Sequence, residues 1–127
     1  MAKPRALIVD DVALNVKLLA LLMAANGYEI ATAESAEAAL DVLPTFLPRL
    51  LLLDLRLPGM DGLALTRQLR ASAEFRDLTI IAVTASAMNG DEAVAIAAGC
   101  DAYVTKPVDT RAFPGTVAAV LERRGVR

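Results

Sequence analysis

The chain is informative first through what it lacks: histidine and tryptophan are absent, cysteine occurs once, and its 127 residues include two tyrosines and three phenylalanines. Without histidine there is no imidazole to serve as a general base or as a zinc ligand. Cys100 has no second cysteine with which to form a disulfide, and no histidine is present to activate its thiol. We therefore expect Cys100 to be a small buried hydrophobic residue.

Long apolar runs and an excess of basic charge are also missing. The longest apolar stretches, 18–25 and 50–53, are far shorter than the ~20 residues that cross a membrane, and no signal-like segment is present. A net charge of -2 leaves no basic field for nucleic-acid phosphates. The local group Arg123, Arg124 and Arg127 is expected to complement the carboxyl end of a helix. We expect a soluble, cytoplasmic protein that binds neither membranes nor nucleic acids.

What the sequence does contain is the composition of a packed domain, with 56% hydrophobic and 22% charged residues. We expect residues 1–127 to form one domain. Periodicity and turn residues predict strands and helices that alternate along the chain. The predicted strands cover 5–9, 28–32, 49–54, 79–84 and 102–105, and the predicted helices cover 12–25, 35–43, 62–71, 90–98 and 110–124.

The predicted strands are continuous apolar runs, most clearly the four leucines of 50–53. Strands of this kind are covered on both faces, as in parallel sheets wrapped by helices. The predicted fold class is therefore α/β, with a doubly wound five-stranded parallel sheet in the order 2-1-3-4-5, flanked by five helices.

Polar residues follow or end four of the predicted strands, and they are Asp10, Asp11, Asp54, Thr84 and Lys106. Ligands of open α/β sheets bind at the carboxyl ends of the strands, so these residues are expected to share one crevice. Carboxylates about 5 Å apart repel by ~3 kcal/mol per pair at an effective dielectric constant near 20. A divalent cation would offset that repulsion. The all-oxygen donors, without histidine or paired cysteine, favour Mg²⁺ or Mn²⁺ over zinc.

Asp54 stands out because a carboxylate that ends a strand of leucines is costly to bury without a functional partner. An ionised aspartate can attack phosphorus without a general base. A nucleophilic carboxylate, a metal ion and a lysine are together sufficient to accept a phosphoryl group.

Four segments carry a resemblance to a known family. They are I-V-D-D at 8–11, L-L-L-L-D-L-R-L-P-G-M-D-G at 50–62, V-T-A at 83–85 and Y-V-T-K-P at 103–107. With these segments in this order, the chain resembles the receiver domains of bacterial response regulators, which have the flavodoxin-like fold. The match spans nearly the whole chain and is closest to stand-alone, chemotaxis-receiver-like members without an output domain.

The resemblance implies a role for each acidic residue of the crevice. Asp54 resembles the phosphoacceptor, and Asp10 and Asp11 resemble the pair that holds Mg²⁺, with Asp11 binding directly and Asp10 partly through water. The third protein ligand would be the backbone carbonyl of Arg56, whose side-chain charge would affect access to the site rather than coordination.

The remaining roles concern the phosphoryl group and the conformational switch. Thr84 resembles the hydroxyl that hydrogen-bonds a phosphoryl oxygen, and Lys106 resembles the lysine that pairs with it. Tyr103 resembles the aromatic residue that changes rotamer on activation, and Lys106-Pro107 resembles the family's cis peptide bond.

The implied partners are a histidine kinase or histidine phosphotransfer protein as donor, and a downstream protein that docks on residues 90–124. The domain would be a switch with slow self-dephosphorylation rather than an enzyme. Two alternatives stay open: a degenerate receiver that acts as an unphosphorylated scaffold, and a haloacid-dehalogenase-like phosphatase. The phosphatase family requires a second acid two residues after its nucleophile, where this chain has Arg56.

Two positions depart from the family pattern. Val12 stands where a polar residue is frequent, and Pro114 lies early in the last predicted helix. Because proline is tolerated in the first turn of a helix but not beyond it, Pro114 places the start of that helix in question.

Overall fold

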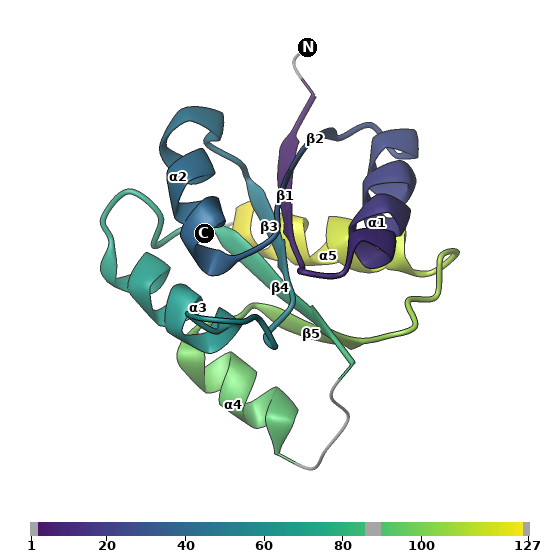
Figure 1. Cartoon of the computed structure of the whole chain (residues 1–127). Helices are drawn as coiled ribbons and strands as arrows, with labels where there is room; N and C mark the ends of the chain where they lie inside the picture. Colours follow the sequence, from purple (N-terminus) through teal and green to yellow (C-terminus); the bar gives the residue numbers. More distant parts are fainter. Residues whose placement is uncertain (1–2, 86–89, 126–127) are drawn as a thin grey trace.

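The computed structural model describes residues 3–85 and 90–125, in which one parallel sheet is wrapped by helices (Figure 1). The strands are β1 (Arg5–Val9), β2 (Glu29–Ala33), β3 (Leu50–Leu53), β4 (Thr79–Thr84) and β5 (Ala102–Thr105). The helices are α1 (Ala13–Ala25), α2 (Ala36–Phe46), α3 (Gly62–Ala71), α4 (Asp91–Ala98) and α5 (Phe113–Gly125). The strand order is β2-β1-β3-β4-β5 with all neighbours parallel, so the predicted fold class is confirmed.

Helices cover both faces of the sheet, with α1 and α5 on one face and α2, α3 and α4 on the other (Figure 1). The leucines of β3 alternate between the two cores, because successive strand side chains point to opposite faces. Leu51 and Leu53 join the core under α2–α4, whereas Leu50 and Leu52 join the core under α1 and α5. All four are at most 1% exposed. Burial on both faces accounts for the continuous apolar run in the sequence.

Helix α2 ends later than the sequence predicts, at Phe46 rather than near residue 43. Pro44 lies inside the helix and lacks the N–H that would bond one turn back. The last turn still forms because the Leu47 N–H donates to the Leu43 carbonyl, and the Leu43 side chain is fully buried. Tertiary packing therefore outweighs the local preference for a break at the proline.

Helix α5 begins later than predicted, at Phe113 rather than at residue 110. The preceding residues form a turn in which the Asp109 carboxylate accepts from the N–H groups of Arg111 and Ala112. Pro114 consequently falls in the first helical turn, where its missing N–H costs nothing. The other boundaries agree with the predictions to within one residue at each end.

Candidate functional site

The carboxyl ends of β1 and β3 meet at the point where the strand order reverses. β1 pairs with β2 on one side and β3 on the other, with Val9 opposite Leu53, so the next residues, Asp10 and Asp54, emerge side by side. The Asp54 N–H donates to the Val9 carbonyl at 2.9 Å, which continues the ladder to the edge of the sheet. The switch point of a doubly wound sheet is where such folds bind ligands.

Three carboxylates gather at this edge. One oxygen from each of Asp10, Asp11 and Asp54 lies within 4.8 Å of the others. Asp10 and Asp54 are buried at 2% and 7% exposure, whereas Asp11 is exposed. The proximity predicted from strand ends is therefore present in the structure.

Lys106 bridges the two buried carboxylates. Its ammonium nitrogen lies 2.6 Å from Asp10 Oδ2 and 2.8 Å from Asp54 Oδ2. Burial alone would lower the pKa of Lys106, but hydrogen bonds and charge interactions with both aspartates outweigh burial and raise the pKa above its ordinary value. The Lys106 N–H donates to the Thr84 carbonyl, and the predicted cis Lys106-Pro107 bond is confirmed.

The other oxygen of Asp54 accepts two hydrogen bonds. Fully buried Thr84 donates its hydroxyl to Asp54 Oδ1 at 3.2 Å, and the Arg56 backbone N–H donates to the same oxygen at 2.8 Å. Both oxygens of Asp54 therefore face donors from separate segments of the chain. The Arg56 side chain is exposed, and the ligand role of its carbonyl stays a prediction.

The charges of this cluster do not balance among the described residues. Three carboxylates face one ammonium group, which leaves two negative charges in excess. The donor atoms are all oxygens, which suits a hard divalent cation. These residues fit a metal ion held by Asp10, Asp11 and Asp54.

Val12 departs from the family pattern in its side chain but contacts the site through its backbone. Its backbone N–H donates to Asp10 Oδ1 at 2.9 Å, so position 12 serves the site through its main chain. With Oδ2 held by Lys106, both oxygens of Asp10 are engaged. Any residue except proline at position 12 could supply the same backbone N–H.

Tyr103, the predicted switch residue, lies close to Thr84. Both line a cavity of about 180 Å³ whose other walls include Leu63 of α3 and Val94 of α4. Tyr103 is half-buried and packs against the core under α2–α4. The structure thus places both predicted switch residues on one cavity.

Two residues that contact the loop after Asp54 were not predicted from the sequence. Gly62 packs so closely on the preceding loop that a Cβ there would lie 2.7 Å from the Asp54 carbonyl oxygen and 2.6 Å from Leu55 Cα. Glu37, in the first turn of α2, accepts from the Met60 N–H at 3.1 Å across 23 residues of sequence. The glycine lies within a recognisable segment, but nothing in the sequence singles out an exposed helical glutamate.

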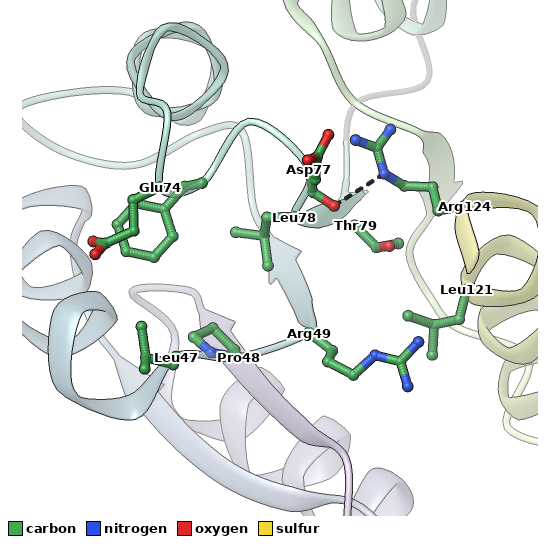
Figure 2. Close-up of a pocket in the computed structure, with 10 residues that line it drawn as sticks. Leu47, Pro48, Arg49, Glu74, Asp77, Leu78, Thr79, Leu121 and Arg124 are labelled. Atoms are coloured by element: carbon green, nitrogen blue, oxygen red, sulfur yellow. Dashed lines mark hydrogen bonds between the residues drawn. The ribbon is translucent and has the colours of Figure 1, made fainter. Parts of the chain in front are cut away.

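A hollow of about 310 Å³ lies beside Asp10 and Asp11, and another of the same volume lies at the opposite edge of the sheet. Figure 2 shows this second hollow between the α2–β3 turn at Leu47, the loop before β4, and the end of α5, where Arg124 donates to the Asp77 carbonyl. No group of three or more potential metal-ligand residues lies there among the described residues. Volume does not distinguish the two edges, so the candidate site is the edge where carboxylates are in excess.

That opposite edge holds a second ion cluster, centred on Asp101. Arg124 donates to Asp101 Oδ1 at 2.7 Å, and Arg70 and the Ile80 N–H donate to Oδ2 at 2.9 and 2.8 Å. The two guanidinium groups also donate to backbone carbonyls of residues 76, 77, 78 and 99. Every charge of this second cluster is paired.

Fold and site together define a doubly wound α/β protein with an acidic, metal-type site at the switch point of the sheet. The model of the response regulator receiver domain family matches residues 6–118. The chain belongs to this family and is a two-component response regulator. Receiver domains are in general not enzymes; they accept phosphoryl groups from histidine kinases and act on downstream targets.

Individual relatives agree with this assignment. The polar-differentiation response regulator DivK of Brucella ovis is 41% identical over 115 residues, covering 91% of this chain and 94% of the relative. The DivK protein of Brucella anthropi is 40% identical over the same share of each chain. A solved structure of a putative response regulator from Chloroflexus aurantiacus superimposes with a TM-score of 0.90 and 33% identity, covering 95% of this chain and all of that one. Within the part that the structure describes, no helix has the length and apolar character needed to span a membrane.

Proposed function

We propose that this response regulator accepts a phosphoryl group on Asp54 in a Mg²⁺-dependent reaction, from a histidine kinase or a histidine phosphotransfer protein. The observation that carries the proposal is the setting of the Asp54 carboxylate. It is 7% exposed, directly follows the all-leucine strand β3, and is contacted by Lys106, Thr84 and the Arg56 N–H. We further propose that residues 1–127 fold as one receiver domain.

The chemistry proposed for Asp54 is a direct transfer. One carboxylate oxygen forms a bond to phosphorus while the P–N bond of the donor's phosphohistidine breaks. The electron pair of that bond stays on the imidazole nitrogen, and no general base is needed because Asp54 is already ionised. Lys106 and the Thr84 hydroxyl contact the Asp54 oxygens before transfer, so both are within reach of the phosphoryl oxygens that join them.

The metal ligands would be Asp10, Asp11, Asp54 and the backbone carbonyl of Arg56. Mg²⁺ is the proposed ion, and Mn²⁺ suits the same oxygen donors. When bound, the ion would offset the negative charge that the carboxylates share with the phosphoryl oxygens. Exposed Asp11 has the freedom expected of a direct ligand, whereas both oxygens of Asp10 are already hydrogen-bonded, which supports a partly water-mediated role.

The proposed switch runs from Thr84 to Tyr103. A phosphoryl dianion would attract the Thr84 hydroxyl, and the movement would change the cavity that Thr84 shares with Tyr103. The surface of residues 90–124 would then present a different shape to a downstream protein. Val94 and Ile96 of α4, each 46% exposed, support a protein-binding role for this surface.

The proposed docking surface for the phosphodonor protein is helix α1. Leu14, Leu18 and Leu21 form one stripe along the helix and are 74%, 48% and 63% exposed, while Leu19 and Met23 fill the core behind them. The stripe begins three residues after Asp11, so a protein seated on it would lie beside the carboxylate cluster. Exposed apolar stripes of this kind mark protein interaction sites.

The proposal is tested by incubating the protein with acetyl phosphate and Mg²⁺ and measuring its intact mass. The wild type should gain one phosphoryl group that is stable in acid and labile in base, and Asp54→Asn should gain none. Asp41→Asn, an exposed carboxylate on α2, is the matched control and should be labelled like the wild type. Equal labelling of Asp54→Asn would overturn the assignment, and no labelling of the wild type would favour the unphosphorylated scaffold.

A further inference from the structure

Glu37 contacts the segment that leads away from the phosphoacceptor. It lies in the first turn of α2, whose N-cap Ser35 accepts from the Ala38 N–H at 3.0 Å and so fixes the start of the helix. From there Glu37 Oε2 accepts from the Met60 N–H at 3.1 Å. The exposed Glu37 side chain thus connects α2 to the β3–α3 loop, residues 54–61, by a hydrogen bond.

The loop is shaped to receive this carboxylate. Gly59 has φ of 74°, a conformation that residues with a side chain rarely adopt, and a Cβ at this position would lie 3.0 Å from Glu37 Oε2. The missing side chain allows the carboxylate to approach the Met60 N–H. Glu37 and Gly59 therefore form a matched contact, which we call the Glu37 tether.

The tether acts on the loop that carries two proposed metal ligands, the Asp54 carboxylate and the Arg56 carbonyl. At its start, the Arg56 N–H is bonded to Asp54 Oδ1 at 2.8 Å. At its end, the Asp61 side chain caps α3 by accepting from the Ala64 N–H. Glu37 holds the middle of the loop from a different helix.

We infer that Glu37 is a positioning residue for the metal site: by holding Met60, it keeps Arg56 beside Asp54 before the ion binds. This inference rests on the proposed function. A loop that is already ordered loses less conformational entropy when its backbone becomes a ligand, so preorganisation raises affinity. Loss of this one exposed hydrogen bond should weaken Mg²⁺ binding roughly fivefold.

The test compares Glu37→Ala with Glu37→Gln. Both variants remove the negative charge, but glutamine keeps an oxygen that can accept from Met60, so their difference isolates the hydrogen bond. Asp41→Ala is the control for loss of an exposed α2 carboxylate. The Mg²⁺ dissociation constant is measured by titrating amide chemical shifts with MgCl₂, and the protection of the Met60 amide by hydrogen exchange.

Glu37→Ala should lose Met60 protection and bind Mg²⁺ roughly fivefold more weakly, the effect of one hydrogen bond. Glu37→Gln should stay within about twofold of the wild type, and Asp41→Ala should be unchanged. A merely structural role would lower the urea midpoint of Glu37→Ala but leave its Mg²⁺ affinity intact, and that result would overturn the inference. Equal weakening in both Glu37 variants would also overturn it, because charge would then be responsible. If the wild type binds no Mg²⁺, the proposed function itself fails.

Discussion

The two edges of the sheet carry ion clusters with excess charge of opposite sign. At the carboxyl edge, three carboxylates meet one ammonium group, and the excess negative charge suits a cation. At the amino edge, one carboxylate meets two guanidinium groups, whose remaining donors reach backbone carbonyls. The first cluster has two negative charges in excess, and the second has one positive charge in excess. Excess carboxylates can bind a cation, whereas guanidinium groups have no lone pairs to offer a ligand and these two already donate to backbone carbonyls. Volume does not separate the two edges, since each has a hollow of about 310 Å³.

The largest expected effect comes from breaking the Asp101 cluster with Asp101→Ala. The three side chains are 13–18% exposed, so the substitution leaves two poorly hydrated guanidinium groups and the Ile80 N–H without their acceptor. Breaking a buried ion pair by removing one partner costs about 3–5 kcal/mol. Urea denaturation should show this loss, while the fraction that remains folded should still be phosphorylated. A loss below about 1 kcal/mol would mean that the cluster is no more than a surface ion pair.

The stability given by the carboxylate cluster of Asp10, Asp11 and Asp54 should instead depend on metal. At a Mg²⁺ concentration about 100 times the dissociation constant, binding to the folded state alone stabilises the wild type by about 2.7 kcal/mol. Asp11→Asn should lose most of that gain, yet be no less stable than the wild type without metal, because it removes a like charge from the cluster. Thermal unfolding with and without Mg²⁺ measures both. Unchanged Mg²⁺ dependence in Asp11→Asn would contradict the ligand role.

The clusters should also differ in alkali. The pKa of Lys106 is raised in the folded protein, so its contribution to stability is complete below the unfolded-state value and is lost as pH rises through the raised folded value. Arginine keeps its charge over this range, so the Asp101 cluster adds no such step. The free energy of unfolding, measured with urea in the absence of metal between about pH 8 and about pH 11, should decline more steeply in the wild type than in Lys106→Met.

Cys100 adds a second pH-dependent contribution to stability in that experiment. Burial raises the pKa of its thiol, so the folded state holds the proton while the unfolded state loses it, and stability falls with pH for this reason as well. Because this decline is common to the wild type and Lys106→Met, the difference between their curves reports Lys106. Parallel curves would contradict the Lys106 contribution.

Thr84→Ala should affect signalling more than stability, since it removes a hydroxyl that is one of three donors to Asp54. The variant should still be labelled on Asp54, though more slowly, and should lose the conformational change near Tyr103 and α4. Amide chemical shifts with and without beryllofluoride, in the wild type and the variant, measure the change. A full wild-type shift pattern in Thr84→Ala would show that coupling does not pass through this hydroxyl.

The smallest effect is expected at an exposed ion pair. Arg5 and Glu29 approach to 3.5 Å with side chains 45% and 53% exposed. Pairs of this kind contribute about 0–1 kcal/mol, so Glu29→Gln should move the urea midpoint slightly and leave labelling unchanged. A loss of unfolding free energy as large as that expected for Asp101→Ala would show that burial does not decide how much these ion pairs contribute.

Sequence reasoning was most successful where local rules suffice. Apolar runs located all five strands to within one residue at each end, and placement after a strand identified the residues that meet at the carboxyl edge. It failed at the end of α2 and at the start of α5. At the former, packing of Leu43 overrides Pro44, and at the latter the Asp109 side chain forms a turn before the helix.

By itself, the sequence determined the carboxylate cluster, because parallel strands bring their carboxyl ends to one edge whatever the loops do. Tertiary structure alone decided which of those charges are paired. It also assembled the Asp101 cluster from α3, α5 and the turn before β5, and the Glu37 tether from α2 and a distant loop. Such contacts depend on how helices pack across the sheet, and that geometry leaves no periodic or local signal in the order of residues.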